Sequence, residues 1–380
     1  RAMRKVAETE NRSPLWGHVG WLGVSAGFLI LSFYSVIAGW AMAYVVKAAS
    51  SVFNGLNEQT SLHLFNDLKA SPLEMTFWHT LFVALTVFIV LRGLKGGIEL
   101  AVRIMMPALF IMLLALVVYG AYAGQFGTAF DFLFAFDFSK LNASVVLAAV
   151  GQAFFSIGVS MGLMMAYGAY LPQTFSIGQS ACIIAAADTV VSLLAGLAIF
   201  PLVFANGLDP AEGPGLIFAV LPITFGNIPA GGLFGTLFFI LLTFAALTSA
   251  IALLEPAVAW LVGSRGMSRR SAALSTGAGI WLVGLLSVAS FSFWGEVYPL
   301  SFIETFKTHT FYDLIDYLTA NIMMPLGGML IALFVGWFVS RQSQEDELGS
   351  KNSAAFGLWR LAIRYFAPFA ILAIFITNLT

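Results

Sequence analysis

The chain contains few residues of the types that build disulfides, metal centres and catalytic sites. A single cysteine and four histidines occur among its 380 residues. Cys182 lies in a long apolar segment, so it is interpreted as core packing with no disulfide partner. The histidines lack metal-ligand spacing, and no nucleophile stands beside a readable base at membrane depth. A disulfide-stabilised secreted domain, a zinc centre and an enzyme are all disfavoured.

Charged side chains are scarce as well. Asp, Glu, Lys and Arg make up 10% of the residues, and the formal net charge is −1. This leaves no basic surface for nucleic acid. Hydrophobic residues, by contrast, make up 59% and aromatic residues 14%, which lies outside the range of soluble domains. We therefore expect an integral membrane protein surrounded by the lipid bilayer.

Several segments reach the length of about 20 mostly apolar residues that a helix needs to cross a bilayer. The candidate spans are 21–46, 77–92, 98–123, 144–171, 177–205, 231–262, 271–293, 312–340 and 357–377. The segment 77–92 is short, but it carries no charge before Arg92. The expected fold class is therefore an all-α membrane protein with about nine transmembrane helices.

Lys and Arg collect in alternate loops, which indicates the cytoplasmic side. The loops rich in basic residues are 1–12, 92–103, 265–270 and 341–364. The loops predicted to face outward are 47–76, 124–143, 206–230 and 294–311. Residues 1–20 are predicted to be a basic cytoplasmic loop. The apolar, Gly- and Pro-rich stretch 207–232 predicts a short helical hairpin over an outer vestibule.

The span 144–171 contains an unusual stretch, FFSIGVSMG, from Phe154 to Gly162. Its two serines and two glycines make a helix easy to interrupt, because glycine lacks a Cβ and serine competes for backbone hydrogen bonds. Unpaired backbone at membrane depth is tolerated only where it lines a cavity or a ligand. The alternative is a small-residue face for close helix packing, since Gly158 and Gly162 form a GxxxG motif. Periodicity alone leaves both interpretations open.

Three residues of the span 231–262 share one helix face. Ala245, Thr248 and Ser249 are spaced i, i+3 and i+4, so two hydroxyls and a carbonyl are available for a hard monovalent cation. Ser and Thr in membrane helices more often bond back to a carbonyl of their own helix. Without further information, this second interpretation is favoured.

Acidic side chains at membrane depth are functional candidates by default. Asp188 is the deepest, so it should be paired, protonated or bound to a cation. Glu255 precedes Pro256, and we interpret it as a structural residue that caps backbone freed by a helix break. Asp316 lies near the outer end of its span.

Several motifs are similar to a known family. They are LSFYSVIAGW (31–40), GQAFFSIGVSMGLMMAYGAYL (151–171), LAGLAIFP (194–201), GPGLIFAVLP (213–222), FAALTSAIALLEP (244–256) and NIMMPLGGMLIALFVGW (321–337). Together they resemble the bacterial branch of the neurotransmitter:sodium symporter family, from one end of the chain to the other. The fold implied consists of two inverted five-helix repeats followed by extra helices, with substrate and sodium at the midplane beside broken helices.

The resemblance also implies a domain organisation. The nine spans correspond to the third to eleventh helices of the family, so the first two helices are expected to be missing from residues 1–380. The chain would form one transporter domain. Its parts would be a cytoplasmic loop (1–20), the remainder of the first repeat (21–123), the second repeat (144–340) and an accessory helix (357–377). The stretch FFSIGVSMG would be the unwound centre of the sixth helix.

Site residues follow from the same resemblance. The substrate pocket would be lined by Ile30, Tyr34, Phe155, Ser156, Gly158, Val159, Met161, Ser249 and Leu253. Tyr34 would bind the substrate carboxylate. The resemblance implies two sodium sites, with ligands from Ser156, Asp188, Ala245, Thr248 and Ser249. Phe155 and Asp316 would form the outer gate. Each sodium site would be incomplete without the first helix, which would also supply the partner of Asp316.

Some positions depart from the family pattern. Gly158 stands where serine is frequent, Ser160 where glycine is frequent, and Gly263 where many relatives carry an inner-gate acid. The function implied is a sodium-coupled symporter of amino acids, hydrophobic or aromatic, that works by alternating access in a bacterial inner membrane. The alternatives are an inert truncated fragment of such a transporter and a channel or receptor on a similar scaffold. The sequence does not set an oligomeric state.

Overall fold

The computed structural model describes residues 2–168, 175–208, 210, 213–348 and 353–379. Its regular elements are helices, and no strand occurs in these ranges. The α-helices are α1 (Ala2–Thr9), α2 (Gly17–Ala49), α3 (Glu58–Ala70), α4 (Pro72–Leu91), α5 (Leu100–Ala123), α6 (Phe126–Phe134), α7 (Ala143–Ser156), α8 (Leu163–Gly168), α9 (Ile177–Ala205), α10 (Leu221–Gly226), α11 (Gly231–Arg265), α12 (Arg269–Phe291), α13 (Phe311–Tyr317), α14 (Met324–Leu333), α15 (Arg341–Leu348), α16 (Ala354–Leu361) and α17 (Ala367–Leu379).

Shorter helical turns continue several of these helices. The 3-10 turns are η1 (Pro14–Trp16), η3 (Phe138–Lys140) and η5 (Glu304–Phe306). The π-helical turns are η2 (Leu94–Glu99), η4 (Leu216–Val220), η6 (Leu318–Met323), η7 (Phe334–Phe338) and η8 (Ala362–Phe366). Of these, η2 leads into α5, η4 leads into α10, η6 joins α13 to α14, and η8 joins α16 to α17.

Eight helical stretches in the described residues are long and apolar enough to cross a membrane. They match eight of the nine predicted spans, and the segment that looked short is the 20-residue helix α4. The ninth predicted span, 144–171, is interrupted, because α7 and α8 flank a non-helical turn. Residues 169–171 of that span lie outside the described ranges. The prediction of an all-helical multi-pass membrane protein with one broken helix is confirmed.

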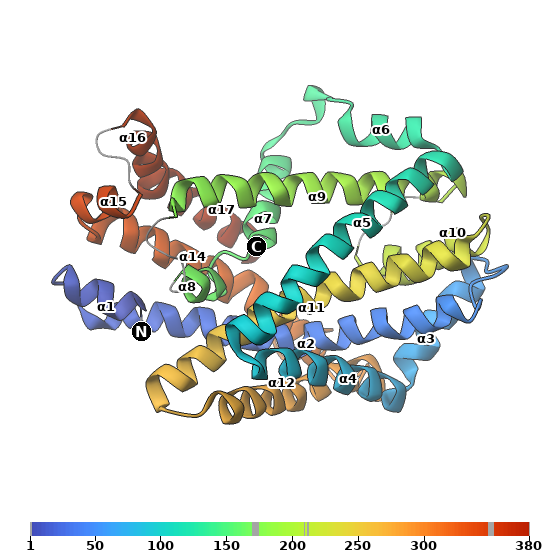
Figure 1. Ribbon diagram of the computed structural model, residues 1–380, viewed down its shortest axis with the longest axis horizontal. Helices are drawn as coiled ribbons and strands as arrows, with labels where there is room; N and C mark the ends of the chain where they lie inside the picture. Colours follow the sequence, from blue (N-terminus) through green and yellow to red (C-terminus); the bar gives the residue numbers. More distant parts are fainter. Residues whose placement is uncertain (1, 169–174, 209, 211–212, 349–352, 380) are drawn as a thin grey trace.

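The helices are arranged around a pair at the centre. Helix α2 packs along α11, and α4 and α12 pack against this pair (Figure 1). On the other side, α5 crosses α9, and α17 packs against α14 and α7. Helix α1, helix α15 and the turn between α11 and α12 gather at one end, and α3 and α10 lie at the other. This separation agrees with the predicted cytoplasmic and outer loops.

The contact between α4 and α12 depends on glycine. A Cβ on Gly277 would collide with the side chain of Val87, and one on Gly284 would lie 2.6 Å from the ring of His79. His79 is fully buried, and its Nε2 donates to the carbonyl of Trp281 at 3.2 Å. The two helices therefore pack with their backbones close together, as small residues permit in membrane proteins.

The prediction that residues 1–20 form a loop was wrong. Helix α1 occupies Ala2–Thr9 and buries Met3 and Ala7, which are spaced i, i+4 on one face. The following residues reach the end of η7, where Arg12 donates to the carbonyl of Phe338 at 3.3 Å. The backbone N–H and the hydroxyl of Ser340 both donate to the Glu10 carboxylate. Short amphipathic helices of this kind give only a weak periodic signal.

The predicted helical hairpin at 207–232 is a single short helix within the described residues, formed by η4 and α10. This helix is buried, and hydrogen bonds to its backbone carbonyls hold it in place. The hydroxyl of Tyr44 donates to the carbonyl of Phe218 at 3.0 Å, and that of Ser61 donates to the carbonyl of Ala219 at 2.6 Å. These bonds fix the segment over the outer ends of α2 and α3.

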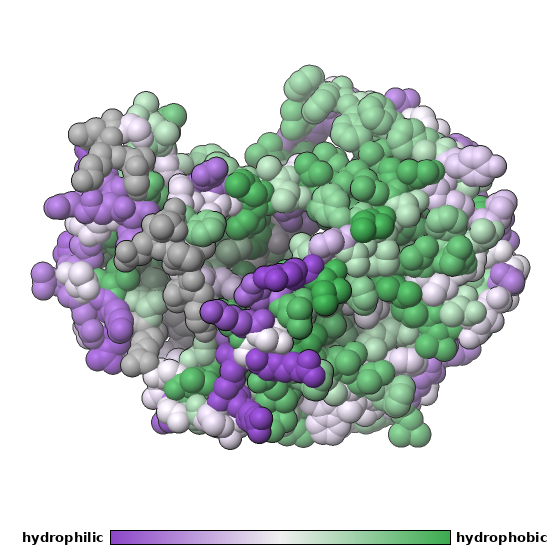
Figure 2. All heavy atoms as spheres, in the orientation of Figure 1, coloured by the Kyte–Doolittle hydropathy of each residue, from purple (hydrophilic) through white to green (hydrophobic). Residues whose placement is uncertain are grey.

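The outer surface is largely apolar. Figure 2 shows hydrophobic residues over most of the face formed by α5, α6 and α9, with hydrophilic residues at the end that holds α1 and α15. On α5, Ile104, Ile111 and Val118 recur every seven residues and are exposed. Such a stripe suits contact with lipid. Cys182 on α9 is exposed in the same way, so its interpretation as core packing was wrong.

Candidate functional site

The break between α7 and α8 is produced by three residues with left-handed backbone. Gly158, Ser160 and Gly162 have φ angles of 68°, 74° and 79°. A positive φ at every second residue cannot continue an α-helix, so the chain turns at this point. Two of the three are glycines, which adopt this conformation freely, whereas Ser160 does so at a cost of about 1–2 kcal/mol. This is the position at which the sequence carries serine where glycine is frequent.

The broken segment is held by α2 and α14. A Cβ on Gly23 would lie 2.5 Å from the carbonyl oxygen of Ser160, so only glycine allows α2 to approach. On Gly27 it would lie 3.2 Å from the carbonyl oxygen of Met161. The hydroxyl of Ser160 donates to the carbonyl of Met324 at 2.8 Å. The left-handed turn is therefore a packed and hydrogen-bonded structure, and its backbone groups are directed toward neighbouring helices.

One predicted pair of polar residues meets at the end of α7. The hydroxyl of Ser156 donates to Oδ2 of Asp188 at 2.9 Å. Ser156 is the last residue of α7, and Asp188 lies in the middle of α9. Asp188 is half-buried. A carboxylate with a hydroxyl beside it presents two hard oxygen ligands at one point.

The face formed by Ala245, Thr248 and Ser249 lies on α11. The hydroxyl of Thr248 donates to the carbonyl of Ala245 at 2.8 Å, so this hydroxyl bonds back to its own helix. That contact also brings two oxygens of the predicted cation site together. Ser249 on α11 lies close to the Tyr34 hydroxyl on α2. Tyr34 and Ser249, both assigned to the substrate pocket, are thus neighbours.

The apolar residues of the predicted pocket come from three different elements. Ile30 on α2, Met161 in the break and Leu253 on α11 are buried in one hydrophobic cluster, and Tyr34 packs against it. Of the remaining pocket residues, Val159 and Gly158 belong to the same broken segment. Residues separated by more than 200 positions in the sequence therefore meet around the break.

The two predicted gate residues lie apart from this cluster. Phe155 is 52% exposed and, with Phe154, lines a cavity of about 470 Å³ between α7, α14 and α17. Asp316 is half-buried on α13, where Tyr312 and Asp313 are its neighbours. The structure does not bring Phe155 and Asp316 into contact with Tyr34 within the described contacts.

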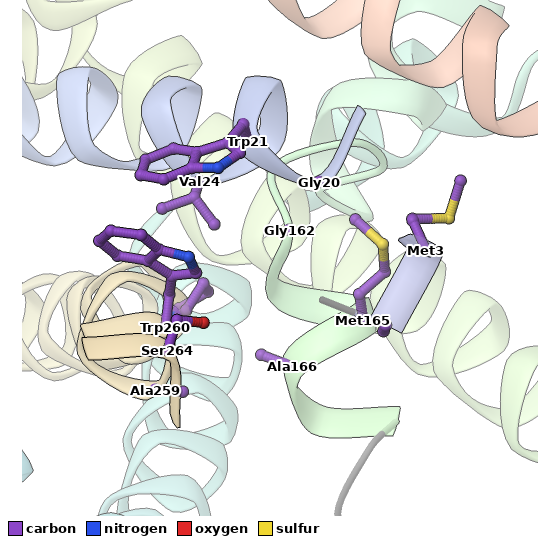
Figure 3. Close-up of a pocket in the computed structure, with 12 residues that line it drawn as sticks. Met3, Gly20, Trp21, Val24, Gly162, Met165, Ala166, Ala259, Trp260 and Ser264 are labelled. Carbon is purple, nitrogen blue, oxygen red and sulfur yellow. The ribbon is translucent and has the colours of Figure 1, made fainter. Parts of the chain in front are cut away.

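A further cavity, of about 160 Å³, adjoins the break on the side of α1. Figure 3 shows Gly162 and Met165 on one wall, Met3 beside them, and Trp21 and Trp260 on the opposite wall. The two indole rings lie 4.2 Å apart between centroids. Gly263 lines an adjoining cleft with Ser264. The break therefore lies next to open space toward the end of the bundle that holds α1.

Sequence reasoning missed the partner of Glu255. The carboxylate is fully buried and binds the guanidinium of Arg269 through two hydrogen bonds, of 3.1 and 2.6 Å. Arg269 also donates to the carbonyl of Val90 at 2.9 Å. The interpretation of Glu255 as a backbone cap is replaced by an ion pair that joins α11, α12 and the end of α4. In the described part of the chain, no group of three or more His, Cys, Asp or Glu could hold a metal ion.

Comparison with known proteins agrees with this arrangement. Residues 56–380 match the profile of the sodium:neurotransmitter symporter family. The sodium-dependent transporter YhdH of Bacillus subtilis is 37% identical over 364 residues, which cover 95% of this chain and 79% of that protein. A sodium-dependent transporter of Haemophilus influenzae is 31% identical over 376 residues, covering 97% and 80%. The crystal structure of MhsT in complex with L-phenylalanine aligns with a TM-score of 0.85 at 39% identity, covering 96% of this chain and 81% of MhsT.

Proposed function

The chain belongs to the sodium:neurotransmitter symporter family, and we propose that it carries hydrophobic or aromatic amino acids by sodium-coupled alternating access in a bacterial inner membrane. The observation that carries this proposal is the left-handed turn at Gly158, Ser160 and Gly162. The turn is irregular backbone within a predicted span, between α2, α11 and α14. In a regular helix the backbone groups bond to one another, whereas backbone groups in such a turn can bind a ligand.

The substrate would bind beside this turn. Tyr34 offers its hydroxyl for the substrate carboxylate, and Ser249 stands next to it. Ile30, Met161 and Leu253 form an apolar wall. Gly158 adds no side-chain bulk, and Met161 is polarizable and adaptable, so a large apolar or aromatic side chain fits this composition. MhsT, a structural neighbour, is a protein solved with L-phenylalanine.

Two sodium ions would be cotransported. Ser156 and Asp188, 2.9 Å apart, would contribute to one site. The carbonyl of Ala245 and the hydroxyls of Thr248 and Ser249 would contribute to the other. A small hard cation in a dry site needs oxygen ligands that replace its hydration shell. Because sodium and substrate would share the broken segment, binding of one raises the affinity for the other, and the effect is reciprocal.

Alternating access requires gates on both sides of this site. Phe155 and Asp316 are proposed to close the outer side. On the inner side, the cavity lined by Trp21, Trp260 and Gly162 gives a route from the break toward the cytoplasmic end. Gly263 cannot provide an inner ion pair, so closure there would depend on the two indoles.

The test is uptake of radiolabelled L-phenylalanine by proteoliposomes that contain the full-length transporter, with sodium or choline outside. We expect sodium to raise the initial rate at least tenfold. Unlabelled Trp, Tyr and Leu should compete, whereas Gly, Ala and Glu should not. Equal uptake in choline would contradict sodium coupling. Effective competition by glycine or glutamate, but not by tryptophan, would contradict the proposed pocket and leave sodium coupling standing.

A further inference from the structure

A groove on the outside of the bundle lies between α2, α11 and α12. Its volume is about 520 Å³, and its walls are mostly apolar: Trp21, Val24, Phe28, Leu29, Ala257 and Leu261. These helices are all candidate membrane spans. The groove is separate from the cluster around Tyr34, because none of the proposed substrate or sodium residues lines it.

One end of the groove is polar. Trp21 and Trp260 also line an adjoining cleft of about 390 Å³, together with Arg4, His18 and Ser264. The two indoles therefore stand where the apolar groove meets the polar cleft, and Figure 3 shows them facing each other. Tryptophan in membrane proteins favours this boundary between headgroups and acyl chains.

Basic residues lie at the polar end, where Arg4 and His18 line the cleft and Arg265 stands beside Trp260. Arg265 ends α11, with its guanidinium 5.6 Å from the centroid of the Trp260 ring, and Arg270 lies in the first turn of α12. Arg269 is bound to Glu255, and Arg4 pairs with Glu8. Within the described residues, neither Arg265 nor Arg270 has an acidic partner within 4.0 Å. Positive charge thus remains available at the mouth.

The length of the groove matches one leaflet. Along α2 the groove runs from Trp21 to Leu29, which is about 12 Å at a helical rise of 1.5 Å per residue. Half of a hydrocarbon core of about 30 Å is roughly 15 Å.

We propose that this groove binds one phospholipid with an anionic headgroup from the cytoplasmic leaflet. The phosphate and headgroup lie in the cleft near Arg265, Arg270 and His18, and an acyl chain lies in the groove along Phe28 and Leu261. Each basic residue near an anionic headgroup raises the affinity about fivefold. The preference for an anionic headgroup therefore comes from charge, and the groove holds the acyl chain.

The experiment measures lipid retention on the purified full chain by native mass spectrometry in detergent, with phosphatidylglycerol and phosphatidylcholine of identical acyl chains. We expect one phosphatidylglycerol per protein, held at least tenfold more tightly than phosphatidylcholine. Arg265→Gln should lower this preference about fivefold. The matched control is Arg92→Gln, because Arg92 is also cytoplasmic by prediction and stacks on an aromatic ring, that of Phe88, at 4.3 Å. The control should leave the preference unchanged.

A second pair of variants tests the groove. Ser275 lines it, and Ser275→Phe should lower retention of both lipids about tenfold, whereas Leu274→Phe on an exposed neighbouring position should not. Quenching of tryptophan fluorescence by phosphatidylglycerol with brominated chains, measured on the unmodified protein, provides a readout that does not depend on variants. Equal retention of the two lipids, an equal loss with Arg92→Gln, or full competition by glycerol phosphate without chains would overturn the proposal. None of these readouts uses transport, so they are independent of the proposed function.

Discussion

Helices α2 and α9 are both apolar, yet they occupy opposite environments. In the most apolar 18-residue stretch of the α2 span, 67% of the residues are buried, against 6% in α9. Helix α2 meets its neighbours through Gly23, Gly27 and Gly39, where an added Cβ would contact other backbone. Helix α9 exposes Ile183, Ile184 and Val190 instead. Hydrophobicity alone therefore does not separate the buried helix from the exposed one, whereas the close glycine contacts do.

The same difference in burial suggests different roles for the acidic residues on buried and exposed helices. Glu255 lies among packed helices and is tied to Arg269, so it holds the structure together. Asp188 lies on the largely exposed helix α9, and its described partner is the hydroxyl of Ser156. An acid at membrane depth whose described partner is a hydroxyl is better explained by ligand binding than by folding.

The largest expected effect comes from breaking the buried ion pair. Arg269→Gln leaves Glu255 buried without its countercharge, which should destabilise the protein by about 3–5 kcal/mol. The control is Arg103→Gln in the exposed pair Arg103–Glu99, where the loss should stay below about 1 kcal/mol. Thermal unfolding in detergent would compare them. Similar losses would show that the interior of the bundle tolerates an unpaired acid.

The second effect concerns the contact between α4 and α12. Gly284→Val places a side chain against the ring of His79 and the carbonyl of Ser32, and should destabilise by about 2–3 kcal/mol. Ala278→Val on an exposed face of the same helix is the control and should cost less than about 0.5 kcal/mol. A stable Gly284→Val protein would mean that the two helices can separate.

The third prediction concerns Asp188 on the exposed helix α9. Asp188→Asn should lower sodium-dependent uptake ten- to a hundredfold, or make uptake depend on chloride, because the fixed carboxylate charge is lost from the proposed sodium site. Thermal stability should change little. Thr189→Val is the matched control, since the Thr189 hydroxyl only bonds back to the carbonyl of Ala185 at 2.9 Å. Wild-type uptake that collapses when gluconate replaces chloride would contradict this assignment.

The fourth prediction measures backbone strain in the break. Ser160→Gly and Ser160→Ala both remove the hydrogen bond to Met324, but only glycine relieves the φ angle of 74°. The glycine variant should therefore be more stable than the alanine variant by about 1–2 kcal/mol. Equal stability of the two variants would show that the left-handed turn is not strained.

The smallest expected effect on stability concerns Glu10, in the segment between α1 and α2. Hydrogen bonds from Ser343 and Ser340 hold the pKa of Glu10 below its ordinary value of 4.5. The lowered pKa means that the carboxylate stabilises the fold above pH 4.5 and loses this contribution as pH falls through the lowered pKa. Because Glu10 is near solvent, Glu10→Gln should cost below about 1 kcal/mol at pH 7. The stability difference between variant and wild type should vanish at low pH.

Much of the fold was predictable because the length and apolar composition of a segment identify a membrane-spanning helix. The break was predictable as one of two alternatives, since Gly158 and Gly162 suit a left-handed turn as well as a packing face. Ser160 as a third left-handed residue was not, because its conformation is imposed by α2 and Met324. The ion pair of Glu255 was missed because Arg269 lies just before the predicted span 271–293. In the sequence it is therefore indistinguishable from a basic residue of a cytoplasmic loop. The roles of Tyr34, Asp188 and Thr248 in transport remain predictions.

The glycine contacts of α12 also affect how the protein is made. Helix α4 leaves the ribosome well before α12, and at about 5–20 residues per second the interval between Leu91 and Arg269 lasts roughly 10 to 40 s. During that time the imidazole of His79 has no carbonyl of Trp281 to donate to, and its surroundings would be lipid. Helix α4 is therefore expected to remain beside α2, or beside an insertion factor, until α12 arrives. Synthesis halted between the two helices should leave α4 accessible to crosslinking from such a factor.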